Sequence, residues 1–136
     1  MGLFSNFDIS GSAISAQSTR LNTTASNLAN SETVASSAKE AYHSRQPVFQ
    51  AMMNDRSRPE EVGVRMLGII ESQSESKPIY DPGHKLANED GYVFGSNVNS
   101  VEEMANMISA SRAYQNNVEV LSTSRDLLLR VLSLGK

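Results

Sequence analysis

The side chains best suited to acid–base or metal chemistry are two histidines, His43 and His84, which lie far apart in the sequence. Histidine changes charge near neutral pH and is a common metal ligand, so His84 with Asp81 or Glu89 would supply half of such a site. However, the run from Asp81 to His84 reads Asp-Pro-Gly-His, which is typical of a tight turn. A hydrogen-bonding role for His84 within that turn is therefore favoured, and no metal is expected.

The remaining charged residues do not indicate catalysis either. Glu102 and Glu103 follow Ser100, and this arrangement is typical of a capping box, in which the serine and the second glutamate cap a helix start reciprocally. The chain contains no Gly-rich phosphate loop, no HExxH motif and no nucleophile elbow. We therefore expect neither an enzyme nor a bound cofactor.

Composition excludes further classes. The chain has 136 residues, a net charge of −3 with mixed signs along its length, and no cysteine. No basic patch of the kind that nucleic acids require is present, and no apolar run approaches the roughly 18 residues of a membrane span. The N-terminus lacks the basic and apolar regions of a classical signal peptide. We expect no nucleic-acid partner and no direct membrane insertion.

The C-terminal stretch of the chain predicts a long helix from about residue 101 to 134. Such a helix would be about 50 Å long at roughly 1.5 Å per residue. Its apolar residues repeat at heptad spacing, interrupted at Ser111 and Arg125, which is typical of a helix that packs along another helix. The predicted seam consists of Met104, Met107, Tyr114, Val118, Leu121, Leu128 and Leu132.

The N-terminal stretch carries a matching stripe. Phe7, Ile14, Leu21 and Leu28 are also seven residues apart, which predicts a helix over about residues 10–30, capped by Asp8 or Ser10. Many of the other residues are Ser, Thr or Asn, whose side chains compete for backbone hydrogen bonds and weaken an isolated helix. This helix is expected to be ordered only when packed against others.

Together the two stripes predict a mainly α fold. The N-terminal arm, residues 1–39, is expected to pair with residues 97–136 as an antiparallel coiled coil that forms the core domain. A small irregular β-hairpin region, residues 40–96, is expected between them. Alternation in residues 62–70 and extended character around Val48 and Phe49 predict the hairpin, and Gly63 and Gly68 indicate a bulge or a close backbone approach.

Polar residues on the two helices are predicted to fix the register of the seam or to serve a second interface. An unsatisfied amide in a packed seam costs about 1–3 kcal/mol, so a buried Asn specifies one alignment. The arginines are expected to form a solvated or inter-subunit charged face. The predicted set is Asn27, Asn30, Arg112, Asn116, Asn117 and Arg125.

Both ends of the chain resemble flagellar basal-body rod proteins. The N-terminal resemblance lies in FDISGSA at residues 7–13, RLN at 20–22 and ASNLAN at 25–30. The C-terminal resemblance lies in VNSVEEM at residues 98–104 and ASRAYQ at 110–115. The middle, from YDP at 80–82 to GYV at 91–93, and the total length are most similar to the proximal-rod members of this family.

The resemblance implies a structural subunit of the proximal rod, the shaft that transmits motor torque across the periplasm. It also implies export through the flagellar type III apparatus without a cleaved signal peptide. The implied partners are other copies of the chain, other rod proteins and the export apparatus. A soluble coiled-coil adaptor or secretion accessory protein is the alternative, and it predicts a well-folded, discrete oligomer in solution.

Overall fold

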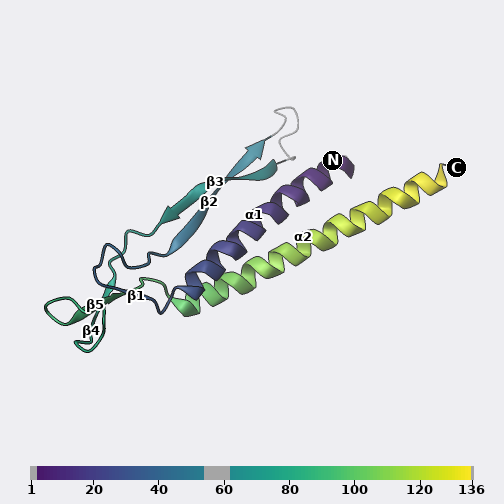
Figure 1. Ribbon diagram of the computed structural model, residues 1–136. Coiled ribbons are helices and arrows are strands. Elements are labelled where there is room, and N and C mark those ends of the chain that lie inside the picture. The colour runs from purple at the N-terminus through teal and green to yellow at the C-terminus, as the bar shows by residue number, and fades with distance from the viewer. Residues whose placement is uncertain (1–2, 54–61, 136) are drawn as a thin grey trace.

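The computed structural model describes residues 3–53 and 62–135. The described elements follow the order α1 (Leu3–Ala29), β1 (Val34–Ala35), β2 (Arg45–Met53), β3 (Val62–Glu71), β4 (Lys77–Tyr80), β5 (Tyr92–Gly95) and α2 (Ser100–Leu134). Figure 1 shows an elongated arrangement in which the β2–β3 hairpin runs along one side of α1 and α2 along the other. The small sheet of β1, β4 and β5 lies at the end where α1 finishes and α2 begins.

Helix α1 accommodates its many hydroxyl side chains by turning them onto its own backbone. Ser12, Thr19 and Thr23 each donate to a carbonyl three or four residues earlier, at 2.8, 3.2 and 2.9 Å. Such bonds satisfy the hydroxyls without breaking the helical ladder. The helix begins at Leu3, earlier than expected, so Asp8 and Ser10 lie inside it and neither caps its start. Ser10 is buried in the packed surface.

Helix α2 has the expected extent but a different cap. The side chain of Asn99 accepts hydrogen bonds from the backbone N–H groups of Val101 and Glu102, at 3.2 and 3.4 Å. The predicted capping box at Ser100 is therefore wrong, since the helix begins at Ser100 itself, one residue earlier than that motif requires. The Glu103 carboxylate points into the fold and bonds Asn27 of α1.

The two helices run antiparallel, and α2 is the longer. Asn27 contacts Glu103, and Arg20 contacts Asn106, so the start of α1 at Leu3 lies level with about residues 123–127 of α2. The last residues of α2 accordingly project beyond α1, as Figure 1 shows. We call residues 128–134 the overhang.

The prediction of a mainly α fold with a small irregular hairpin is wrong. Among the described residues, 49% lie in helices and 24% in strands, and the strands form two antiparallel sheets. The β2–β3 hairpin pairs Arg45 with Glu71 at one end and Met53 with Val62 at the other, and it packs on α1 as a layer in its own right. Residues 77–80 form β4, which pairs with β5 through contacts that are distant in the sequence.

The glycine-based expectations for the hairpin are confirmed. The register shifts between Val48 and Phe49, opposite Gly68 and Met66, which is a β-bulge. At Gly63 the backbone approaches α1 closely, since a Cβ there would lie 3.2 Å from the Ser12 Oγ. Ser12 Oγ also accepts a hydrogen bond from the Val64 N–H at 3.1 Å, which fastens β3 to α1. The sequence Asn-Asp-Arg-Ser-Arg-Pro at residues 54–59 predicts a turn, but it lies outside the described residues.

Large apolar side chains contribute little to the interior. Among the residues whose burial is described, the buried apolar ones are Ala16, Ala41, Val93, Val98 and Ala110. The buried polar ones include Ser10, Thr23, Thr24, Asn27, Glu103 and Ser124. Since burial of Leu, Ile and Phe normally supplies most of the stability of a fold, this chain depends strongly on satisfied polar contacts.

Candidate functional site

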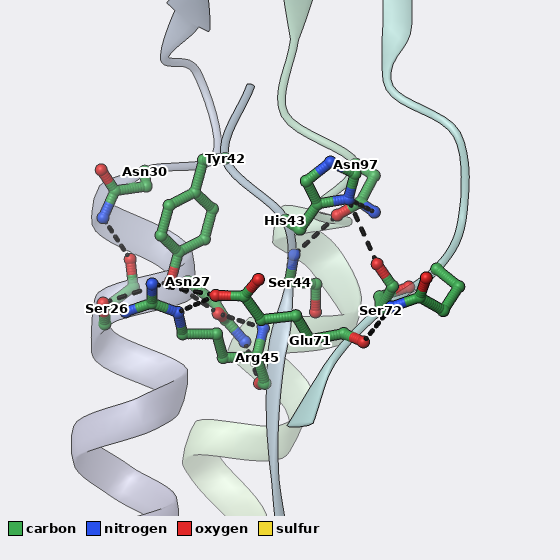
Figure 2. Close-up of polar contacts among 11 residues, drawn as sticks. Ser26, Asn27, Asn30, Tyr42, His43, Ser44, Arg45, Glu71, Ser72 and Asn97 are labelled. Atoms are coloured by element: carbon green, nitrogen blue, oxygen red, sulfur yellow. Dashed lines mark hydrogen bonds and ion pairs between the residues drawn. The ribbon is translucent and has the colours of Figure 1, made fainter. Parts of the chain in front are cut away.

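Asn27, on the last turns of α1, is the hub at which three elements meet. Its side chain is 1% exposed. Its Nδ2 donates to the Arg45 carbonyl at 2.8 Å and to the Glu103 carboxylate at 3.0 Å. Its Oδ1 accepts from the Arg45 N–H at 2.9 Å and from the Tyr42 hydroxyl at 3.0 Å (Figure 2). Both donors and both acceptor positions of the amide are therefore used, which fixes α1, α2 and β2 in one alignment.

A second amide, Asn97, fixes the chain just before α2. Its Oδ1 accepts from the Ser44 N–H at 2.7 Å, and its Nδ2 donates to the Ser74 carbonyl at 2.9 Å. Its Nδ2 also lies 3.1 Å from Nδ1 of His43, whose Nε2 lies 3.3 Å from the Ala38 carbonyl. Figure 2 shows Asn97, His43 and Ser44 beside the Asn27 hub. His43 is thus a structural residue of the junction.

A half-open cleft of about 320 Å³ adjoins the hub, between α1, the start of α2 and the start of β2. Glu102 and Glu103 line it from α2, Pro47 and Phe49 line it from β2, and Arg20 lines it from α1. The Arg20 guanidinium donates to the Asn106 side chain at 3.2 Å. The cleft therefore combines carboxylates with an apolar wall.

Arg45, which also borders the cleft, is engaged elsewhere. Its guanidinium forms an ion pair with Glu71 at 3.0 Å and lies 5.5 Å from the centroid of the Tyr42 ring. This pair joins β2 to β3 and is half exposed, so its own contribution to stability is small.

The residues considered for catalysis are not brought together. His84 Nδ1 accepts from the Leu86 N–H at 3.1 Å, and the backbone N–H of His84 bonds the Asp81 carbonyl at 3.1 Å, which confirms the predicted turn. Within residues 3–53 and 62–135, no group of three His, Asp or Glu side chains is placed to hold a metal ion. In the same ranges, neither helix combines the length and the apolarity that crossing a bilayer demands.

The predicted seam residues divide into two sets. Phe7, Ile14, Leu21 and Leu28 on α1 are half-buried, as are Met107, Tyr114, Leu121 and Leu128 on α2. Met104, Val118 and Leu132 are 49%, 43% and 61% exposed. The stripe of α2 that faces α1 has its residues alternately four and three positions apart. Besides the half-buried residues of α2 just named, it contains Glu103, Ala110, Asn117 and Ser124.

The predicted polar set is likewise divided. Asn27 is the hub, whereas Asn30 and Asn117 donate to carbonyls of their own helices, those of Ser26 and Ala113, at 2.8 and 2.7 Å. Arg112, Asn116 and Arg125 lie exposed on α2.

Sequence reasoning missed four residues of the junction. Tyr42, Arg45, Asn97 and Asn106 make contacts with partners 15 to 86 positions away, so their roles depend on long-range folding. Tyr42 and Arg45 belong to no sequence motif that would indicate a buried contact. Asn97 and Asn99, however, lie just before the expected start of a helix. Because Asn is a preferred N-cap residue, a structural role for them could have been predicted.

Comparison with known proteins is consistent with this architecture at both helices. A family model described as "Flagella basal body rod protein" matches residues 7–35, and one described as "Flagellar basal body rod FlgEFG protein C-terminal" matches residues 89–134. The two matches therefore cover most of α1 and all of α2.

Full-length relatives extend the match to the whole chain. The chain is 47% identical over 136 residues to "Flagellar basal-body rod protein FlgC" of Escherichia coli O6:H1. It is 46% identical over 137 residues to the FlgC of Salmonella typhimurium and 46% identical over 136 residues to that of Yersinia enterocolitica. In each case the alignment covers 100% of both chains. The resemblance to rod proteins, and to their proximal-rod members, is thereby confirmed. The chain belongs to the flagellar basal-body rod protein family, and it is a structural subunit of the rod of the flagellar basal body.

Proposed function

We propose that this subunit polymerises through the faces of its two terminal helices into a shaft that transmits torque, without any chemical step. One observation carries the proposal: among the described residues, about half of the large apolar side chains of the single chain are exposed, and very few are fully buried. On α2 these include Val101, Met104, Ile108, Val118, Leu129 and Leu132. Exposed apolar area of this extent on an elongated subunit is typical of a surface that neighbouring subunits cover.

The geometry of the helices suits a helical assembly. A contact between two different faces of like subunits generates a helical array whenever the rotation does not close into a ring. The inner stripe of α2 packs on α1, while its outer face, with Met104, Val118 and Leu132, remains open to a neighbour. We propose that the half-buried stripe residues support the first contact, and that the exposed ones form the second.

Membership of the rod family implies association with other flagellar rod proteins. We propose that residues 1–39 and 97–136 form the assembling unit and that residues 40–96 form an inserted region that braces it. Torque would then pass through many helices in lateral contact. Exposed Arg112, Asn116 and Arg125 are proposed to contact neighbouring subunits and to select their alignment.

We further propose that the chain is a cargo of the flagellar type III export apparatus. Two features support this. The chain has no cysteine, so its folding requires no oxidation. Its interior contains few large apolar side chains, so an unfolded form suited to a narrow channel costs comparatively little to maintain.

Hydrogen exchange on the purified chain and on isolated basal bodies tests the assembly proposal. In the purified chain we expect protection near the Asn27 hub, where buried hydrogen bonds gather, and fast exchange at the far ends of both helices. In basal bodies we expect protection along the full length of α1 and α2. Strong protection of both whole helices in a monomer would count against a subunit that completes its folding on assembly.

A further inference from the structure

The overhang of α2 has an unusual combination of side chains. Residues 128–134 read LLRVLSL, so they are apolar except for Ser133 and a single charge, Arg130. Leu129, Val131, Leu132 and Leu134 are all exposed. Arg130 is exposed too, and no acidic side chain lies within 4.0 Å of its guanidinium among the residues that the structure describes. The antiparallel alignment leaves this segment, apart from the half-buried Leu128 at its start, beyond the described part of α1.

The cleft beside the hub has the complementary character. Glu103 is 6% exposed and borders the cleft, and its carboxylate accepts one hydrogen bond from the amide of Asn27. Within residues 3–53 and 62–135, no basic side chain lies within 4.0 Å of that carboxylate. A buried carboxylate without a cation is costly, so the site favours the arrival of a positive group.

The surroundings of Glu103 indicate which cation fits. Glu102 adds a second carboxylate at the exposed rim, and Pro47 and Phe49 form an apolar wall. A planar guanidinium binds carboxylates through two parallel hydrogen bonds and stacks well on an aromatic ring, which a lysine ammonium does less effectively. The two arginines already at the cleft are occupied, Arg20 with Asn106 and Arg45 with Glu71.

We infer that the overhang of a second copy of this chain docks at the cleft, with its Arg130 between Glu102 and Glu103 and its leucines against Pro47 and Phe49. The inference rests on the proposed function, because it specifies one contact of the assembly. The two surfaces lie at opposite ends of α2, about 40 Å apart along the helix, so Arg130 cannot reach the cleft of its own chain. A contact between opposite ends of two copies is head-to-tail, and it leaves each copy with a free cleft and a free overhang for the next.

Paired single-cysteine variants test the contact directly, because the natural chain has no cysteine. Cells would produce Glu102→Cys and Arg130→Cys chains together, and isolated basal bodies would be oxidised. We expect a disulfide-linked dimer that requires both variants. The matched control replaces Arg130→Cys by Glu119→Cys, which is exposed on the middle of α2. Equal yields from the two pairs, or no dimer from either, would overturn the inference.

Charge exchange provides a second measurement. Glu102→Arg and Arg130→Glu should each lower incorporation into basal bodies by roughly tenfold, the change that loss of one partly desolvated charge pair produces. The chain that carries both changes should regain most of the lost incorporation. The single variant Arg130→Lys, in contrast, should be incorporated little better than Arg130→Glu. Failure of the double variant to recover would overturn the inference. Absence of the unmodified chain from basal bodies would instead contradict the proposed function.

Discussion

The amide of Asn27 lies 3.0 Å from the carboxylate of Glu103, 76 positions later in the chain, and both side chains are almost wholly buried. This contact joins the end of α1 to the start of α2. Because the other three hydrogen bonds of Asn27 go to Arg45 and Tyr42, the same amide also sets where the hairpin begins. A single polar side chain thus links α1, α2 and β2.

Replacement of this amide should be strongly destabilising. Asn27→Leu removes four hydrogen bonds and leaves the Glu103 carboxylate buried without a donor, so we expect a loss of about 3–5 kcal/mol in the free energy of unfolding. Urea unfolding of the purified chain measures it. Asn22→Leu, at an exposed position of the same helix, is the control and should change the value little. Similar losses in the two variants would show that the hub has no special role.

The position of the α2 cap can be checked with neighbouring residues. Asn99→Ala should cost about 1 kcal/mol, because the backbone N–H groups of Val101 and Glu102 lose their acceptor. Ser100→Ala should have a much smaller effect, since its side chain does not cap the helix. Thermal unfolding of the two variants side by side gives the difference. A larger effect at Ser100 would restore the capping box that the sequence indicated.

The two hairpin glycines offer a matched pair for testing the contact between β3 and α1. A side chain at Gly63 meets the Ser12 hydroxyl at 3.2 Å, whereas nothing lies within 4 Å of a Cβ at Gly68. We expect Gly63→Val to destabilise the chain by about 1–3 kcal/mol through overpacking, and Gly68→Val to have little effect. Urea midpoints provide the measurement. Equal midpoints would mean that the hairpin does not press on α1 at this point.

A charge in the half-buried stripes should prevent assembly. Leu28→Asp and Leu121→Asp each place a carboxylate between packed surfaces without a cation, which costs several kcal/mol. We expect non-motile cells with basal bodies that lack the rod, and a normal cellular level of the variant chain. Swimming assays, electron microscopy and immunoblots measure these outcomes. Gln115→Asp, on an exposed position of α2, is the control. Motile cells that carry either stripe variant would contradict the packing role.

Local sequence patterns were sufficient for several elements. Heptad spacing predicted both helices, and the end of α1 and nearly the whole extent of α2 agree with it. Alternation predicted the hairpin, and glycine placement predicted a bulge or a close backbone approach; the structure has both. The terminal motifs identified the family. These features are encoded by neighbouring residues, because helical periodicity, turn chemistry and glycine geometry act over a few positions.

Only the tertiary structure decided which face of α2 meets α1. Apolar periodicity favoured Met104, Val118 and Leu132 as partners of the Met107 series, but these are exposed. The stripe toward α1 is completed by Glu103, Ala110 and Ser124, which are small or polar and are buried because Asn27 and the close approach of the helices accommodate them. A hydrophobicity pattern cannot distinguish a face that packs within the chain from one that awaits a neighbour. Satisfied long-range hydrogen bonds make that distinction here, and they exist only once the chain has folded.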